Sequence, residues 1–385
     1  MRKYRIAASI TALVVAGSLA GAAVADSATA NATTDGSDAA TTTESASTVS
    51  REAQTLGMEA LSNARELGGY VGADGRTVKQ GLLLRTAKLA DATEADLAKL
   101  VDEYNLGYVC DFRTSAERES DPDPVLEGVQ YVWCSLVDEE SDTGVVATDW
   151  GEGDTASLLA NPVEFESGEV VSTDEASESE QATEAEQTAE AEQTAASDQP
   201  AETDQPAESE GQDAEAQQKA ALSATVQTLV EYSEAFDLPT MYDATIDSEQ
   251  AQKGFHAFFD VLLNNKDGKA VLWHSTAGKD RAGLCAALLL SALGVDRETI
   301  LDDFALTNEF NAVKIEALVA TAEADGYTAE QVQAVRDLTG VNRDYLEHTL
   351  DYIDETYGSM HDYLVNQIGL TEDEIAQLQE MYLEA

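Results

Sequence analysis

Basic residues are scarce in this sequence. Its 385 residues include 22 Lys and Arg against 74 Asp and Glu, which leaves a formal net charge of −52. Binding to nucleic acid or to an anionic membrane surface needs clustered Lys and Arg that neutralise phosphates. The composition therefore excludes a general polyanion-binding surface. Any anionic ligand must be bound by a small local cluster of positive charge.

Cysteines are also few: Cys110, Cys134 and Cys285. Because the number is odd, at least one thiol has no intramolecular partner. Each lies in an apolar stretch, which favours a buried, unpaired side chain, although a bridge between Cys110 and Cys134 stays open. The sequence contains no evident cluster of metal ligands, and we expect neither a metal nor another cofactor.

The N-terminus has the pattern of a targeting segment. Three of the first five residues are basic, residues 6–22 are small and apolar, and residues 23–25 fit a small-residue cleavage site. This pattern predicts a secretory signal peptide over residues 1–25, cleaved after Ala25. The alternative is an uncleaved membrane anchor. We expect a secreted or cell-surface protein with no stable membrane insertion after cleavage.

Two further segments have biased compositions. Residues 26–50 are rich in Ala, Thr and Ser, which is typical of a spacer. Residues 138–221 hold 25 acidic residues and one basic residue, with short repeats and few aromatics. Such a segment buries too little apolar surface to offset its ordering entropy, so we predict a disordered insertion. The flanks, 51–137 and 222–385, would then form one domain, which we expect to be a monomer.

The flanks alternate between strand-like and helix-like patterns. Strands are predicted at 82–84, 108–112 and 131–134, with a helix that Thr93 caps between the first two. After the insertion come a helix over 255–263, a strand over 270–273 and a helix over 283–293. From residue 298 onward the pattern is helical, with breaks near Gly326, Gly340, Gly358 and Gly369. This order predicts an α/β fold, a central sheet flanked by helices, with a helical C-terminal part.

The segment HSTAGKDRAG, residues 274–283, joins the strand at 270–273 to a buried helix. A strand, a tight polar loop and a helix N-terminus form an anion-binding arrangement, since loop amides and the helix dipole face the ligand. The loop matches neither a Walker A loop nor a nucleophile elbow. We predict that a phosphate is bound by Ser275, Thr276, Ala277, Gly278, Lys279, Asp280 and Arg281.

This loop resembles the phosphate loop of bacterial tyrosine-protein phosphatases, in the form His-Cys-x-Ala-Gly-Lys-Asp-Arg-Thr-Gly. Residues 63–70, 81–86 and 111–117 and the C-terminal tail are similar to further segments of that family, in the same order. The resemblance implies a tyrosine phosphatase-like three-layer fold and phosphomonoester hydrolysis through a cysteine thiolate. It also implies a phosphorylated protein or a phosphoinositide headgroup as the partner.

Two positions depart from the family pattern. Ser275 occupies the nucleophile position, where the family has Cys, and Ala282 stands where the family usually has Thr or Ser. A positive loop brings a thiol pKa from about 8.5 into the range of about 3.5–7.5, whereas a serine hydroxyl starts far higher and needs a base or a metal. We therefore expect a loop that binds phosphate and turns over little or not at all.

The resemblance assigns roles to single residues. Asp280 is the candidate general acid, with Asp111 as the alternative, and Arg281 grips the phosphate. His274 is expected to shape the loop, and Arg65 and Arg113 are expected to be structural. Two other functions stay open: an active tyrosine, dual-specificity or phosphoinositide phosphatase, and an acidic surface protein that uses the domain as a scaffold.

Overall fold

The computed structural model describes residues 50–137 and 207–385. The predicted signal peptide, nearly all of the spacer and most of the acidic insertion lie outside the described residues. Within the described ranges, no helix combines the length and the apolar composition that crossing a membrane requires.

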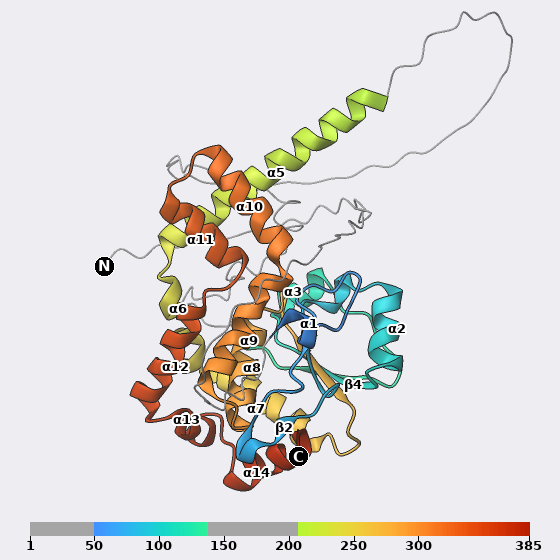
Figure 1. The fold of residues 1–385 in the computed structure, drawn as a ribbon, viewed down its shortest axis with the longest axis vertical. Helices are drawn as coiled ribbons and strands as arrows, with labels where there is room; N and C mark the ends of the chain where they lie inside the picture. The colour runs from blue at the N-terminus through green and yellow to red at the C-terminus, as the bar shows by residue number, and fades with distance from the viewer. Residues whose placement is uncertain (1–49, 138–206) are drawn as a thin grey trace, which may run out of the picture.

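The centre of the fold is a five-stranded sheet (Figure 1). Its order is β1 (Arg65–Glu66), β3 (Leu83–Thr86), β6 (Ala270–His274), β4 (Leu106–Asp111) and β5 (Gln130–Trp133). β1 is antiparallel to β3, and all other neighbours are parallel. The four strands predicted from the sequence are β3 to β6, whereas the two-residue β1 has no sequence signal of its own.

Helices cover both faces of this sheet. α2 (Glu94–Asp102) lies on one face and has Thr93 as its N-cap, as predicted; Asp96 completes a capping box that was not predicted. α7 (Glu249–Asn264) and α8 (Asp280–Ala292) lie on the other face, where Trp273 of β6 is fully buried and its ring stands 5.2 Å from that of Phe258. The hydrophobic residues of β6 therefore form the middle layer of an α/β core, which confirms the predicted fold class.

The C-terminal part is helical, as predicted, with breaks at the four glycines. Gly326 ends its helix in the left-handed conformation, which favours glycine. A two-stranded sheet of β2 (Thr77–Val78) and β7 (Leu383–Glu384) returns the C-terminus to the N-terminal part. The remaining helices are α1 (Arg51–Gln54), α3 (Ser115–Ser120), α6 (Leu238–Asp247), α9 (Arg297–Phe310), α10 (Ala312–Asp325), α11 (Ala329–Thr339), α12 (Arg343–Tyr357), α13 (Met360–Asn366) and α14 (Glu372–Tyr382), with short 3-10 turns at Ala73–Gly75 and Leu89–Asp91.

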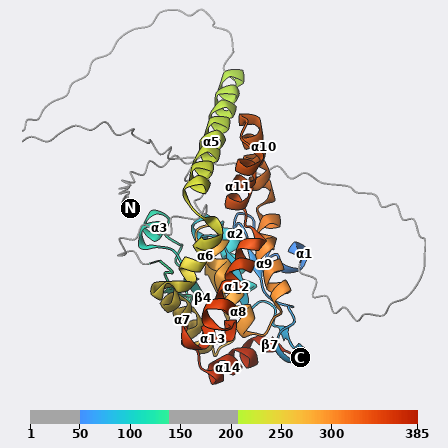
Figure 2. The ribbon, with the colours of Figure 1, turned by 90° about the vertical axis from the view of Figure 1, so that its left-hand side faces the viewer.

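The end of the predicted insertion is helical rather than disordered. α5 (Ala207–Ala235) begins inside the range 138–221, because its Ala, Glu and Gln residues favour helix. Its later turns pack against α10 and α11 in a separate apolar cluster that includes Val226, Val230 and Leu338 (Figure 2). The described part of the chain therefore resumes at residue 207, before residue 222, where the predicted domain resumes.

All three cysteines are buried, and none forms a disulfide. Burial raises the pKa of the Cys285 thiol, so this side chain stays protonated and acts as a small apolar group. The open alternative of a bridge between Cys110 and Cys134 is not realised in this structure.

Candidate functional site

The predicted phosphate loop lies at the carboxyl edge of the parallel strands. Thr86 of β3 and Asp111 of β4 both pair with His274, the last residue of β6. The loop 275–279 leaves the sheet at this point and enters α8 at Asp280. Ligands of open α/β sheets bind at this edge, where helix N-termini also meet.

Gly278 permits the tight turn of the loop. Its φ of +67° is in the left-handed region, and a Cβ at this position would lie 2.2 Å from the carbonyl oxygen of Thr86. The Gly278 amide donates to the Ser275 hydroxyl oxygen at 3.2 Å. The turn therefore curls around the side chain at the nucleophile position.

Two side chains hold the loop from outside. Asn63 donates to the Gly278 carbonyl at 2.8 Å, and Arg85 donates to the carbonyls of Gly278 and Lys279 at 2.9 and 3.0 Å. In a trans peptide the N–H points away from the C=O. The amides that follow these carbonyls, those of Lys279 and Asp280, are therefore turned towards the inside of the loop.

Arg85 belongs to a buried charge cluster below the loop. Asp303 on α9 accepts from Arg85 at 3.1 Å, from Arg65 at 3.2 Å and from the Tyr70 hydroxyl at 3.1 Å. Burial and the neighbouring Arg65 lower the pKa of Arg85, yet an arginine keeps its charge in a protein. Because two guanidinium groups share one carboxylate, the cluster adds positive electrostatic potential below the loop, in a molecule that is otherwise acidic.

Arg281 is buried at the start of α8 and pairs with Glu117 of α3. Its two terminal nitrogens donate to the two Glu117 carboxylate oxygens at 2.7 and 2.9 Å, and one of them also reaches the Phe112 carbonyl at 3.3 Å. Burial raises the pKa of Glu117, but the charge and hydrogen bonds of Arg281, together with hydrogen bonds from Thr276 and Thr114, lower it by more in total, so the net shift is well below the usual range. The planar fork of Arg281 is thus fixed by a carboxylate that stays ionised.

The loop is closed in this structure. Ser275 is 0% exposed, and Thr276, whose hydroxyl donates to Glu117, is almost as deeply buried. Ala277 is the loop residue with partial exposure. The Ser275 side chain is therefore covered by protein atoms in this structure.

Lys279 faces away from the loop interior. Its ammonium donates to the carbonyls of Leu338 and Gly340 at the C-terminal end of α11, at 2.5 and 3.1 Å. In this structure the Lys279 ammonium therefore links the loop to the end of α11, and its contact with phosphate stays a prediction. The carbonyls at a helix end are natural acceptors for such a cation.

The two candidate acids have different surroundings. Asp280 accepts from the Tyr242 hydroxyl of α6, and its other oxygen lies 3.7 Å from the Lys279 ammonium. Asp111 is bound by Arg113 at 2.9 Å and by Arg118 at 3.1 Å. Burial raises the pKa of Asp111, while His274 and Arg113 lower it, with a net downward shift that keeps this carboxyl ionised. The choice of Asp280 as the acid stays a prediction.

His274 does not face the Ser275 hydroxyl. Its Nε2 lies 3.0 Å from Asp123, and its Nδ1 lies 3.3 Å from the Ser275 carbonyl oxygen. The imidazole, Asp111 and Asp123 are close enough to share a cation. However, Arg113 already bridges both carboxylates, at 2.9 and 2.7 Å, so the local negative charge is compensated.

Several residues of the site have no sequence signal strong enough to find them. Glu117, Arg85 and Asn63 fall within segments that resemble the family, yet their contacts with the loop come from the fold. Asp303 and Tyr242 lie in ordinary helical patterns. The contacts of these two side chains with Arg65, Arg85 and Asp280 identify them as part of the site.

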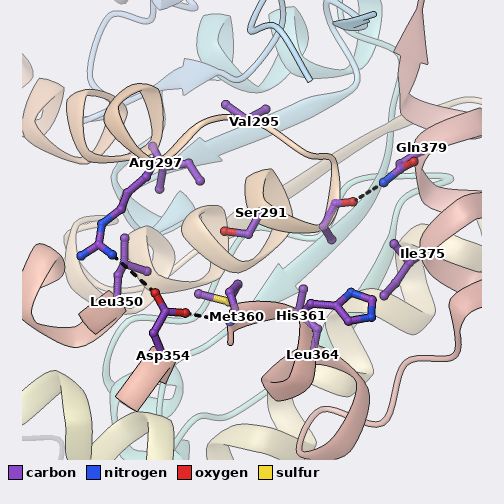
Figure 3. A pocket seen from close by; sticks show the side chains of 12 residues that line it. Ser291, Val295, Arg297, Leu350, Asp354, Met360, His361, Leu364, Ile375 and Gln379 are labelled. Atoms are coloured by element: carbon purple, nitrogen blue, oxygen red, sulfur yellow. Dashed lines mark hydrogen bonds and ion pairs between the residues drawn. The ribbon is translucent and has the colours of Figure 1, made fainter. Parts of the chain in front are cut away.

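A separate pocket lies at the opposite end of α8. It has a volume of about 310 Å³ and is lined by apolar and polar side chains from α8, α9, the loop between them and α12 to α14, among them Val295, Leu350 and Met360 (Figure 3). Arg297 and Asp354 form an ion pair of 3.6 Å at its rim. None of the residues predicted to bind phosphate lines it.

Comparison with known proteins agrees with this geometry. A model of the tyrosine phosphatase family matches residues 56–384. A protein of Cupriavidus necator that carries the name of a tyrosine-protein phosphatase is 27% identical over 328 residues, 85% of this chain and 88% of that protein. The triple specificity protein phosphatase PtpB of Mycobacterium tuberculosis is 31% identical over 165 residues, 40% of this chain and 55% of PtpB. The family model matches most of the length of this chain, and the chain therefore belongs to the tyrosine phosphatase family.

Proposed function

We propose that this chain binds the phosphoryl group of a phosphorylated substrate in the loop 275–281 and turns it over little or not at all. The observation that carries the proposal is Ser275 at the nucleophile position of a loop that keeps the family's anion-binding parts. Membership of the tyrosine phosphatase family supports phosphorylated substrates as the ligand class.

The loop geometry supports phosphoryl binding. The amides of Lys279 and Asp280 turn inward because Asn63 and Arg85 hold the preceding carbonyls. The N-terminus of α8 adds partial positive charge. Arg281 lies at the same helix start as a planar fork, which suits two phosphate oxygens. Glu117 would share this guanidinium with the ligand.

The surroundings of Ser275 support weak turnover. A serine nucleophile needs an adjacent base, and the neighbouring imidazole of His274 directs its Nε2 to Asp123 instead. Ala282 supplies no hydroxyl to the loop. Asp280, held by Tyr242, would serve as acid for a leaving oxygen in an active version of the site.

We further propose that the protein acts outside the cell, as the N-terminal pattern of residues 1–25 indicates. Fractionation of the producing cells, followed by N-terminal sequencing of the exported chain, tests this part. The expected mature N-terminus is Asp26. An intact N-terminus in the cytoplasmic fraction would contradict export.

Phosphate binding is the first test of the site. Titration calorimetry with inorganic phosphate should give saturable binding to the wild type, weakened about tenfold or more in Arg281→Lys, which keeps the charge but loses the fork. Arg336→Gln is the control, because it removes one exposed arginine of α11 whose side chain pairs with Glu316. Equal phosphate affinity in wild type and Arg281→Lys would contradict the proposed pocket.

A further inference from the structure

An exposed aromatic and a cation are stacked at the rim of the phosphate loop. Trp133 ends β5, the outer strand of the sheet, and is 47% exposed although it is a large apolar side chain. The Arg118 guanidinium of α3 lies 4.9 Å from the centre of its ring, and the Arg118 side chain is 39% exposed. A stacked pair of this kind costs conformational entropy to hold at a surface, which suggests a use.

Two independent connections place this pair beside Arg281. The consecutive carbonyls of Phe112 and Arg113 accept from Arg281 at 3.3 Å and from the Trp133 indole at 2.8 Å, respectively. On α3, the consecutive residues Glu117 and Arg118 contact Arg281 and Trp133. In each of these two segments, the residue that contacts Trp133 therefore directly follows the residue that contacts Arg281.

The charge of this rim is unusual for the molecule. One nitrogen of Arg118 bonds to Asp111 at 3.1 Å, and the central carbon of the guanidinium lies over the indole ring. Asp111 is itself shared with Arg113, which also pairs with Asp123, so the two arginines balance the two carboxylates here and Arg118 is the half-exposed member of the group. In a chain with a net charge of −52, a half-exposed guanidinium beside the phosphate loop is a local attractor for a second anionic group.

We infer that Arg118 and Trp133 form a specificity site that binds the carboxylate of an acidic residue next to the phosphorylated residue of a peptide. This inference rests on the proposed phosphoryl binding at the loop. The rim carbonyls that contact Arg281 and Trp133 belong to consecutive residues. The two anionic groups of the ligand are therefore expected on neighbouring residues of an extended peptide. Among the described strands β5 is an outer strand, and the edge of such a strand can pair with an extended chain. Trp133 is a positioning residue that fixes the guanidinium plane.

The experiment compares two phosphotyrosine peptides that differ only in a Glu or a Gln beside the phosphotyrosine. Fluorescence anisotropy measures the ratio of their Kd values for each variant. The wild type should prefer the Glu peptide about fivefold, the size expected of one partly exposed charge pair. The preference should fall below about twofold in Arg118→Gln and lie between these limits in Trp133→Leu.

Arg336→Gln is the matched control. Arg336 is 41% exposed and pairs with one carboxylate, so this variant changes the net charge equally and should keep the fivefold preference. Circular dichroism spectra and melting curves verify that each variant is folded. If Arg118→Gln does not fold, Arg118→Lys, which keeps the charge but not the planar stack, should show a reduced preference.

The outcomes separate this inference from the proposed function. If phosphate and both peptides fail to bind the wild type, the proposed function and the rim site both fall. If phosphate binds and the two peptides bind equally, only the rim site is overturned. If the loss in Arg118→Gln appears for a bisphosphorylated inositol headgroup and not for the Glu peptide, the rim binds a second phosphate and the peptide assignment is wrong.

Discussion

Replacing Asp303 with Asn should remove the support below the phosphate loop. Within residues 50–137 and 207–385, Asp303 is the carboxylate that pairs with both Arg65 and Arg85, and its side chain is 2% exposed. The amide keeps the shape and one acceptor oxygen but loses the negative charge. Two buried guanidinium groups are then left without the carboxylate that compensates them.

The expected effect is large because breaking a buried ion pair costs about 3–5 kcal/mol. The full side-chain burial means that solvent does not screen this loss. For a folded part of this size, each kcal/mol lowers Tm by about 2–4 °C, so we expect a decrease of about 6–20 °C. The loss should extend to function, since Arg85 also holds the carbonyls of Gly278 and Lys279.

The assay is thermal and urea unfolding, followed by circular dichroism, together with phosphate titration of the folded variant. Asp302→Asn is the control: the neighbouring carboxyl is 56% exposed, lies 3.6 Å from Arg343, and should change stability by less than about 0.5 kcal/mol. An Asp303→Asn variant as stable as Asp302→Asn would refute the cluster as a buried support.

Two further changes test the loop itself. Gly278→Ala should abolish phosphate binding in the titration, because the new Cβ would lie 2.2 Å from the Thr86 carbonyl oxygen at a φ of +67°; retained affinity would contradict the turn geometry. Glu117 has a pKa below its ordinary value of 4.5 when folded, so its pairing with Arg281 stabilises the protein above that pH and is lost as pH falls through the folded pKa. Urea unfolding should therefore show a stability difference between wild type and Glu117→Gln that is largest at pH 7 and shrinks below about pH 4.5; a constant difference would be evidence against the ion pair.

Much of the fold follows from local patterns. The buried run at 270–273 and the polar loop after it predict β6 and the start of α8, and Thr93 predicts the N-cap of α2. The glycine breaks of the C-terminal part mark helix ends correctly. α5 differs, because its Ala and Glu content fits both helix and disorder until its later turns meet α10 and α11.

The candidate site is only partly predictable, because its partners are far apart in sequence. The loop residues are recognisable together, but Glu117 reaches Arg281 from α3, and Lys279 reaches the end of α11. A cation in a phosphate loop suggests a ligand contact, yet carbonyl groups at a helix end compete for it. Whether the Lys279 ammonium contacts a ligand or these carbonyl groups depends on tertiary packing, which a local sequence pattern does not show.

The most direct measurement of the central claim is the hydrolysis rate of an aryl phosphate by wild type and Ser275→Cys under identical conditions. A thiol in the same loop would ionise where the serine hydroxyl does not, so Ser275→Cys should exceed the wild type by roughly a hundredfold or more. A Ser275→Ala variant sets the background rate, and the wild type should equal it. A fast wild type that Ser275→Ala inactivates, with no gain in Ser275→Cys, would contradict the account.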